Sequence, residues 1–487
     1  MLAQGRRGPR QITPMRAALR SFVLPGWGQH SQGRFAAATR FLQVVILLTA
    51  LAIPVLLIRD ELPAMFVRPW FLVLLIVVNL GVMIFRTWAV WDAWRAGARA
   101  LLTPGIVILV VVAIAPHALG TYYLGQTYSL INSLFDNPVA APTTIRPVAT
   151  TRQTEVSGVQ ATTSSSTTST STTTTVPWAE KGQLNVLLLG GDAGPGRRGL
   201  RTDTMIVASI NTETGNAALF GLPRNLGSLR WPDGDRFTAY QGILNEVYTY
   251  GIDNPDKFEG KNPGASAIRL MAEGLTGIEI DYYMIVNLEA FVEIVEAFDG
   301  IDIYVPKRLY DPSYPTVNNK QVKIDIPKGW NHLDGATALA YVRTRADGSD
   351  YTRMARQRCF LAALVGQADV PSLLVALPAL VDTIKENVET DIPLDALPNL
   401  VDLAGKTKAA DIIVVGFGRD WSKGLTKRGY PIPNVPRIHN AVAAAIAKLA
   451  GEPDPDGPKL TDAGKACGLD KAAAEAAELS EEPDEGA

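Results

Sequence analysis

The chain has 487 residues and a formal net charge of −2, so it is long enough for more than one domain and carries no overall charge that would attract nucleic acid or a membrane surface. Its two cysteines, Cys359 and Cys467, are too few for a disulfide framework, and without neighbouring histidines they form no zinc site. They can pair if this part of the chain is exported, but the sequence does not place their Cα atoms close together. Four histidines in the whole chain disfavour a histidine-ligated metal centre.

The N-terminal part of the chain combines a basic segment with apolar stretches. Residues 1–40 contain seven arginines and no acidic residue, and apolar stretches follow at 41–58, 70–85 and 101–120. Each stretch approaches the roughly 20 residues that cross a bilayer as a helix. Because three such stretches follow one another with a consistent charge bias, we expect three transmembrane helices at 41–125 rather than buried core helices.

Charged residues in the loops predict the orientation of this anchor. The loop at 86–100 carries three arginines and one acid, whereas the loop at 59–69 balances two arginines against two acids. The positive-inside rule then places 1–40 and 86–100 in the cytoplasm, and three crossings place everything after the anchor outside. We therefore predict a multi-pass protein of the cytoplasmic membrane with its N-terminus inside.

Composition divides the remainder of the chain into three segments. Residues 126–182 are predicted to be an extracellular linker, because 161–175 is almost entirely serine and threonine and cannot pack a core. Residues 183–450 have the mixed pattern of a globular domain that is long enough for a large core. Residues 451–487 are rich in acidic residues, alanine and proline, and we expect a disordered acidic tail.

Apolar patterns in the globular domain alternate between strands and helices. Strands are predicted for LNVLLLGGD, TMIVASIN and AALFGLPR, the last two joined by a hairpin turn at 212–215, and further strands at 301–306 and 410–418. We expect residues 336–345 to begin as a helix and to pass into a strand. The other predicted helices are at 264–275, 287–298, 352–367, 371–387, 394–405 and 434–450. This mixture predicts an α/β or α+β sandwich around one sheet.

Polar clusters follow several of these strands, and ligands gather at strand ends in α/β sheets. The first cluster is GGDAGPGRRGLRTDT, in which Asp192 and Asp203 flank a loop of glycines and arginines. Two carboxylates at one sheet edge can share Mg²⁺, which proteins hold with one or two carboxylates and substrate phosphates. The alternative is a solvated loop with a capping aspartate. The loop also contains three arginines that suit phosphate oxygens: Arg197, Arg198 and Arg201.

The second and third clusters consist mainly of arginines. Arg224 ends an apolar strand, although a lone arginine at such a position is more often a surface residue. LAYVRTRADGSDYTRMARQRCF, residues 339–360, contains five arginines, and an extended backbone would point Arg343 and Arg345 the same way. Like charges at this spacing repel, so the stretch favours either an anion with several oxygens or ion pairs with its own aspartates.

The predicted helix after this stretch adds further polar groups. Arg353 and Gln357 lie four residues apart on one helical face, Arg356 lies three residues from Arg353, and Asp350 is a candidate N-cap. Together the clusters fit a pyrophosphate with a metal better than a catalytic triad. The chain has no GxxxxGK[ST], GxSxG or HExxH motif, and His332 in GWNHLDG is expected to be a turn residue before a helix.

Five stretches in this order resemble the LytR-CpsA-Psr (LCP) family of cell-wall glycopolymer ligases. They are NVLLLGGD, RTDTMIVASIN, LFGLPRN, DYYMIVNLEAFVEIVEAFDGIDIYVP and HLDGATALAYVRTRADGSDYTRMARQ. The resemblance implies an α-β-α sandwich around a central mixed sheet, held outside the membrane. It also implies transfer of a phospho-linked glycopolymer from a polyprenyl-pyrophosphate carrier in the membrane lipid to peptidoglycan, with Mg²⁺ or Mn²⁺.

The resemblance also implies roles for individual residues. The metal ligands would be Asp192 and Asp203, the catalytic residues Arg343 and Arg345, and the acceptor of the hydroxyl proton Asp203 or Asp350. Departures from the family pattern are Gly194 in place of an arginine, Asn225 in place of an aspartate, and the lack of a basic residue before the Ile-Leu-Asn segment that ends at Asn245. The pyrophosphate-binding residues would be Arg201, Arg224, Arg343, Arg345, Arg353 and Gln357.

Two other functions use the same residues and stay open. A polyprenyl-pyrophosphate phosphatase would use water in place of the glycan acceptor. A membrane-tethered scaffold would bind lipid or polymer without turnover. The identity of the glycopolymer and the oligomeric state are not determined by the sequence.

Overall fold

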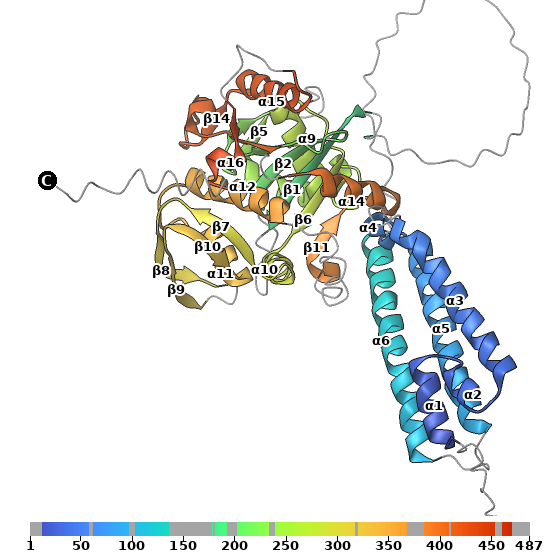
Figure 1. Ribbon diagram of the computed structural model, residues 1–487. Coiled ribbons are helices and arrows are strands. Elements are labelled where there is room, and N and C mark those ends of the chain that lie inside the picture. Colours follow the sequence, from blue (N-terminus) through green and yellow to red (C-terminus); the bar gives the residue numbers. More distant parts are fainter. Residues whose placement is uncertain are drawn as a thin grey trace, which may run out of the picture.

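The computed structural model describes residues 12–57, 62–96, 103–135, 178, 181–191, 202–232, 239–316, 320–367, 384–408, 411–452 and 460–469. Figure 1 shows two parts: a bundle of long helices and an α/β domain that stands at one end of the bundle. The predicted linker at 126–182 lies largely outside the described residues, and so does most of the helix predicted at 371–387.

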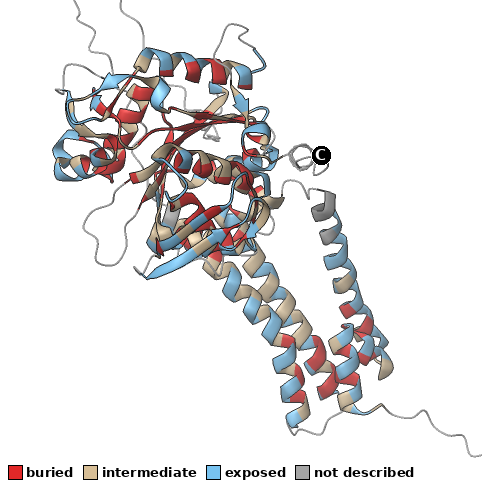
Figure 2. Ribbon diagram, turned by 90° about the vertical axis from the view of Figure 1, so that its left-hand side faces the viewer, coloured by how far each residue is buried: buried red, intermediate tan, exposed pale blue. Residues whose placement is uncertain are grey.

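Long apolar helices form the bundle. α5 (Pro69–Arg95) and α6 (Pro104–Phe135) are long and apolar enough to cross a membrane, and large apolar side chains such as Ile46, Val77 and Ile108 are exposed on the outside of the bundle (Figure 2). α3 (Phe35–Leu57) contains a shorter apolar segment, Phe35–Leu51. The described residues therefore contain two helices that meet the length and composition of a membrane span, and the expected set of three is not confirmed.

Short helices at the N-terminus pack against α5. They are α1 (Pro14–Val23) and α2 (Trp27–Ser31), and α4 (Leu62–Phe66) lies at the other end of the bundle. Arg34 makes an ion pair of 2.8 Å with Asp92, the one acid in the second basic segment. That segment was counted as a loop from residue 86, although its tryptophan spacing is that of a helix, and in the structure α5 continues to Arg95, where Val90 and Trp94 pack with Ala18 of α1.

A seven-stranded mixed sheet forms the centre of the domain. Its order is β11–β6–β1–β2–β3–β12–β15, with β1 parallel to β6, β3 parallel to β12, and the other neighbours antiparallel. The predicted hairpin after β2 is confirmed, and the predicted sandwich around a mixed sheet is confirmed as well. The strands are β1 (Gln183–Gly191), β2 (Thr202–Asn211), β3 (Ala217–Gly221), β6 (Tyr282–Val286), β11 (Val388–Thr390), β12 (Ile412–Gly416) and β15 (Thr461–Asp462).

Helices cover both faces of this sheet because its strands are apolar on both sides. One face presents Leu187, Val207 and Phe220 to α8 (Val247–Asp253), α9 (Pro263–Thr276) and α15 (Val435–Leu449). The other face presents Ile206 and Leu219 to α12 (Asp350–Gln367). Burying one such side chain stabilises the fold by about 1.5–3 kcal/mol. α10 (Leu288–Ala297), α11 (Gly335–Arg343) and α14 (Leu397–Lys406) pack around the same sheet.

The segment at 336–345 differs from its prediction. It forms α11 as far as Arg343 and then an extended Thr344, and no strand follows. Asp334 caps the helix by accepting a hydrogen bond of 2.7 Å from the Thr337 amide, and Ala338, Leu339 and Val342 form a continuous buried helical face. His332 also differs, since it lies in a strand rather than a turn and pairs with Asp302 at 2.8 Å.

Small two-stranded sheets lie around the central sheet, four of them within the described residues. They are β4 (Gly227–Leu229) with β5 (Tyr240–Ile243), β7 (Ile301–Val305) with β10 (Gly329–Leu333), β8 (Leu309–Pro315) with β9 (Gln321–Ile326), and β13 (Ser422–Leu425) with β14 (Pro431–Pro433). The sheet of β8 and β9 extends along the side of the domain beside α11 (Figure 1).

A disulfide joins the C-terminal segment to the domain. Cys359 on α12 is bonded to Cys467, with 5.3 Å between their Cα atoms, and the sequence separation is 108 residues. The chain before Cys467 forms β15, which pairs with β12, and α16 (Ala463–Ala466). The prediction of a disordered tail from residue 451 therefore differs from the structure for residues 460–469, which pack on the sheet because Ala463 and Cys467 are buried.

We predict that replacing both cysteines, Cys359→Ser with Cys467→Ser, lowers the free energy of unfolding by about 2–5 kcal/mol. The reason is that a bridge closing a loop of roughly 100 residues restricts the unfolded chain by about 4.7 kcal/mol in the chain-entropy model. Urea unfolding of the oxidised protein and of the double variant measures the difference, with the reduced wild-type protein as control. Equal unfolding midpoints for all three would contradict this role.

Candidate functional site

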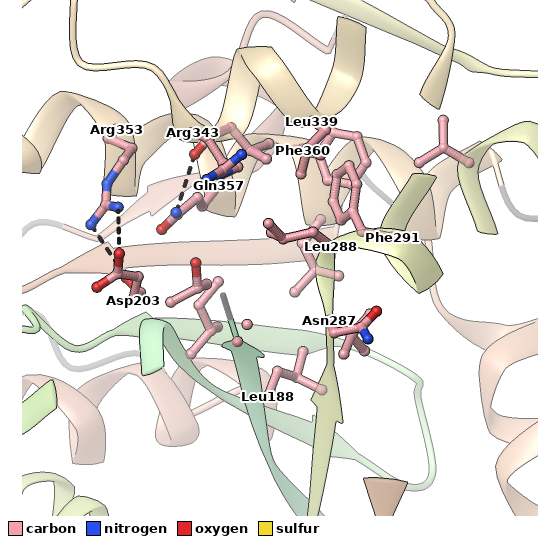
Figure 3. A pocket seen from close by; sticks show the side chains of 18 of the residues that line it. Leu188, Asp203, Asn287, Leu288, Phe291, Leu339, Arg343, Arg353, Gln357 and Phe360 are labelled. Carbon is pink, nitrogen blue, oxygen red and sulfur yellow. Dashed lines mark hydrogen bonds and ion pairs between the residues drawn. The ribbon is translucent and has the colours of Figure 1, made fainter. Parts of the chain in front are cut away.

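A cavity of about 510 Å³ opens between the sheet and the helices α10, α11 and α12. Most of its wall is apolar, and Figure 3 shows Leu288, Phe291, Leu339 and Phe360 gathered on one side. They face Leu188 of β1 across the opening. The lining also includes Ile206, Met284, Val286, Val295, Val342, Leu361 and Leu364. Such a wall suits a long hydrocarbon ligand, because each CH₂ group moved out of water contributes about 0.8 kcal/mol.

Polar groups line the other end of this cavity. Asp203 comes from the start of β2, Arg343 from the end of α11, Arg345 from the following turn, and Arg353 from the first turns of α12. Figure 3 shows Asp203 and Arg353 together, away from the apolar side chains. Gln357 also lines this end and donates to the Val342 carbonyl at 3.2 Å. The structure thus brings five of the residues singled out in the sequence to one cavity.

Two carboxylates and two guanidinium groups form an ion network at the polar end. Asp203 accepts a hydrogen bond of 2.5 Å from Nη1 of Arg224, and its backbone carbonyl accepts one of 3.2 Å from Arg353. Asp350 lies 2.9 Å from Nη2 of Arg353 and 3.4 Å from Nε of Arg224. The Asp203 carboxylate also lies 4.0 Å from Nη1 of Arg353, so each carboxylate is within ion-pair distance of both arginines. This arrangement compensates the repulsion between the two cations and fixes their positions.

Burial and like charges act on Arg353 together. Its side chain is 4% exposed, and desolvation lowers its pKa from the usual value, with the cations of Arg224 and Arg345 acting in the same direction and the two aspartates opposing them. For Arg224, burial also opposes the charge, but the hydrogen bond and charge of Asp203 outweigh it and raise the pKa. An additional anion at this end would therefore stabilise a cation that burial disfavours.

Hydrogen bonds from a neighbouring arginine hold the turn that carries Arg343 and Arg345. Arg356 is buried and donates to the Tyr341 carbonyl at 2.7 Å, to the Thr344 carbonyl and to Asp347. Arg356 therefore fixes this turn, and its ion pair with Asp347, like that of Arg353 with Asp350, is the pairing within the stretch that the sequence left open as an alternative. Arg343 donates to the hydroxyl of Tyr314 at 3.2 Å, while Arg345 is exposed.

Some predicted site residues either lie outside the described part of the chain or do not line the cavity. Asp192, Arg197, Arg198 and Arg201 lie outside the described residues. Asp350 contacts the network but is not part of the cavity wall, so its place is behind Arg224 and Arg353. Arg224 is not part of the cavity wall either; it is linked to the cavity through its hydrogen bond to Asp203.

The chemistry of the described acids fits a hard divalent cation only in part. Asp203 offers a carboxylate that lines the cavity, which is the ligand type that Mg²⁺ prefers. In the part of the chain that the structure describes, no group of three or more histidine, cysteine, aspartate and glutamate side chains lies close enough to hold a metal ion. A site made of one or two carboxylates and substrate phosphates needs no such group.

Several residues of the site carried no recognisable motif in the sequence. Tyr314 and Asp311 line the cavity from β8, and Asp311 accepts a hydrogen bond of 2.5 Å from Thr344. Tyr314 and Asp311 bond to residues of a turn that is about thirty residues further along the chain, so no local sequence pattern identifies them. Arg358, the fifth arginine of the stretch, lies against Gly221 and Gly416, and its buried Nε and Nη1 make no hydrogen bond. Burial lowers its pKa to about 10.

Comparisons with known proteins identify the family of the chain. The model described as the LytR_cpsA_psr family matches residues 148–426. A protein of Oceanobacillus iheyensis, named polyisoprenyl-teichoic acid–peptidoglycan teichoic acid transferase TagU, is 29% identical over 234 residues, 46% of this chain and 63% of that protein. The probable cell wall biosynthesis protein LcpB of Corynebacterium glutamicum is 30% identical over 191 residues, 38% of each chain. The matched parts thus span less than two thirds of both relatives.

Solved structures provide a further comparison. The crystal structure of TagV from B. subtilis is 23% identical and covers 56% of this chain and 99% of that chain, with a TM-score of 0.42. The family assignment rests instead on the family model, which matches more than half of the 487 residues. The chain belongs to the LytR-CpsA-Psr family.

Proposed function

We propose that this protein transfers a phospho-linked glycopolymer from a polyprenyl-pyrophosphate carrier to peptidoglycan. The observation that carries the proposal is one cavity with two chemically different ends. The apolar wall around Phe291 and Phe360 matches a polyprenyl chain, and the arginines at the other end match a pyrophosphate. Relatives named as teichoic acid transferases support the same reaction class.

Charge at the polar end favours an anion with several oxygens. Arg343, Arg345 and Arg353 line the cavity together with two acids: Asp203 is already paired with Arg224, and Asp311 accepts a hydrogen bond from Thr344. A guanidinium group binds phosphate oxygens with two parallel donors, and such charge-assisted hydrogen bonds are about twice as strong as neutral ones. Arg345 is exposed and has room to bind an incoming group.

The proposed step is an exchange at phosphorus. A hydroxyl group of the peptidoglycan acceptor attacks the phosphorus that bears the glycopolymer. A new P–O bond forms, the anhydride bond breaks, and polyprenyl phosphate leaves. The hydroxyl proton passes to a carboxylate, for which Asp203 is better placed than Asp350 because it lines the cavity. Catalysis then rests on positioning and on stabilisation of charge by the arginines.

We also propose that Asp203 and Asp192 hold Mg²⁺ or Mn²⁺. When bound there, the ion would neutralise charge on the phosphate oxygens. Support comes from the place of Asp203 in the cavity wall and from the carboxylate at position 192 at the far end of the same loop.

The proposed reaction needs the domain to lie near the outer surface of the membrane. The basic segments at 1–40 and 86–100 favour a cytoplasmic N-terminus. Apolar side chains at the end of the bundle contact the domain, with Val67 and Leu72 packed against Leu397 of α14. We propose that the apolar segment of α3 also crosses the membrane, in addition to α5 and α6, and three crossings place the domain outside.

We predict that Arg343→Ala and Arg345→Ala each lower the rate of glycan transfer at least 100-fold, because each removes a donor to the developing phosphate charge. Turnover of a lipid-linked glycan with peptidoglycan as acceptor measures the effect. Arg308→Ala is the matched control, since Arg308 is an exposed arginine paired with Asp325 away from the cavity. Normal transfer by both site variants would refute the proposal, and release of free glycan with water as acceptor would indicate a phosphatase.

We predict that Asp203→Asn weakens Mn²⁺ binding to the purified protein at least tenfold and abolishes stimulation of transfer by Mg²⁺. The loss of one negative ligand explains both effects. Electron paramagnetic resonance of Mn²⁺ measures binding without any turnover, and Asp420→Asn, at an exposed aspartate, is the control. If Asp203→Asn binds Mn²⁺ as tightly as the wild-type protein does, the metal ligand is not Asp203.

A further inference from the structure

A second cavity, of about 440 Å³, lies in a part of the domain to which no role has yet been given. It is formed by β5, the following turn at Leu244–Glu246 and helix α8. Its described wall consists of Tyr240, Asn245, Glu246, Tyr250 and Asp253, together with Ile243 and Thr249. This combination of rings, carboxylates and an amide contrasts with the long apolar wall of the first cavity.

Aromatic packing holds the two tyrosine rings of this cavity in place. The rings of Tyr240 and Tyr250 lie 5.4 Å apart in an edge-to-face arrangement, and Trp231 lies 6.1 and 6.0 Å from them. Phe258 supports Tyr250 at 6.0 Å. A rigid tyrosine presents an apolar face and a hydroxyl at little entropic cost, which suits a flat ligand with an apolar face and polar edges.

The charge of the second cavity disfavours an anionic ligand such as a phosphate, which the first cavity favours. Glu246 and Asp253 are acidic, and no cation is among the described lining residues, while Lys257 lies over the Tyr250 ring at 5.2 Å and donates to its hydroxyl at 3.1 Å. A phosphate would be repelled, whereas hydroxyl and amide groups can donate hydrogen bonds to the carboxylates. Asn245 adds an amide to the wall, and its Oδ1 atom is buried without a hydrogen-bond partner.

Backbone hydrogen bonds join this cavity directly to the polar end of the first. The amide of Asn245 donates to the carbonyl of Arg224 at 3.0 Å, and the amide of Leu244 donates to Leu226 at 3.0 Å. The side chain of Arg224 in turn donates to Asp203 at 2.5 Å. One residue, Arg224, therefore bonds through its main chain to the wall of the second cavity and through its guanidinium group to the acid of the first.

We propose that the second cavity binds an uncharged sugar ring of the glycan strand that accepts the transferred polymer. The inference rests on the proposed transfer reaction and specifies where its acceptor is bound. Tyr240 contacts the apolar face of the ring, Tyr250 and Asn245 border it, and Asp253 accepts hydrogen bonds from its hydroxyl groups. The next sugar along the strand then extends toward Arg224 and the phosphorus.

Direct binding tests this assignment without the donor lipid. The full-length protein in detergent is titrated with a soluble tetramer of N-acetylglucosamine and with a peptidoglycan tetrasaccharide, by calorimetry. We expect Asn245→Ala and Asp253→Ala each to weaken binding at least tenfold. Ile252→Ala is the matched control, because Ile252 is exposed on the same helix, is 47% exposed and lies outside the cavity wall. Asp253 is itself exposed, so its variant tests binding even where Asn245→Ala disturbs folding.

Steady-state kinetics distinguish the proposed acceptor site from the proposed transfer reaction. In the variants the KM for the glycan acceptor should rise at least tenfold, and more than the KM for the lipid donor. Wild-type protein that binds neither oligosaccharide, or variants that bind as tightly as Ile252→Ala, would overturn the acceptor site while leaving transfer intact. Wild-type protein that binds the oligosaccharides but transfers nothing to glycan would instead overturn the proposed transfer reaction.

Discussion

The pairing of Asp203 and Asp350 with Arg224 and Arg353 is the interaction on which the site depends. Arg353 is almost completely buried, and without its partners an unpaired cation in that position would cost about 3–5 kcal/mol. The two carboxylates make it possible to hold cations from three separate segments close together. One of these carboxylates faces the cavity and the other lies behind the arginines, so the same network both supports the fold and leaves donors at the cavity. Because two carboxylates are needed to hold these arginines together, stability alone does not explain why so many arginines lie in one stretch of the sequence.

A charged end and an apolar end share one cavity because different elements build them. The apolar wall comes from α10, α11, α12 and the sheet, whereas the charged end comes from the start of β2 and the turns around α11 and α12. A lipid with a pyrophosphate head has the same division. Contacts between α14 and the end of the bundle keep this cavity on a domain that is attached to the anchor (Figure 1). The second cavity is joined to Arg224 by a main-chain hydrogen bond, so that donor and acceptor would meet at that residue if the acceptor binds there as proposed.

Much of this arrangement was predictable from the sequence where local pattern and tertiary structure agree. The strands that became β1, β2, β3 and β12 are continuous apolar runs, as expected for a sheet that is covered on both faces. Arg343, Arg345, Arg353 and Gln357 could be selected because like charges rarely gather without a ligand or partners. Their convergence with Asp203 depends instead on the end of α11, the turn after it and the first turns of α12, whereas the sequence had placed Arg343 and Arg345 on a strand.

Other features depended on contacts between distant residues and could not be predicted. Arg356 and Arg358 have the same residue type as Arg353, but one bonds carbonyls of the preceding turn and the other lies over two glycines of the sheet. The order of residues 460–469 depends on Cys359, more than a hundred residues away, so composition alone indicated disorder. The cavity at Tyr240 and Tyr250 requires Trp231 and Phe258 behind it, which no spacing in the sequence reveals.

The most direct test of the central claim compares three polyprenyl ligands of equal chain length on the purified protein. The ligands are the alcohol, the monophosphate and the pyrophosphate, and their dissociation constants are measured at low and at high salt. The account predicts that affinity increases in that order, that the increase shrinks with salt, and that the alcohol still binds through the apolar wall. Equal affinity for all three would show that the arginines do not bind the diphosphate, and would contradict the account.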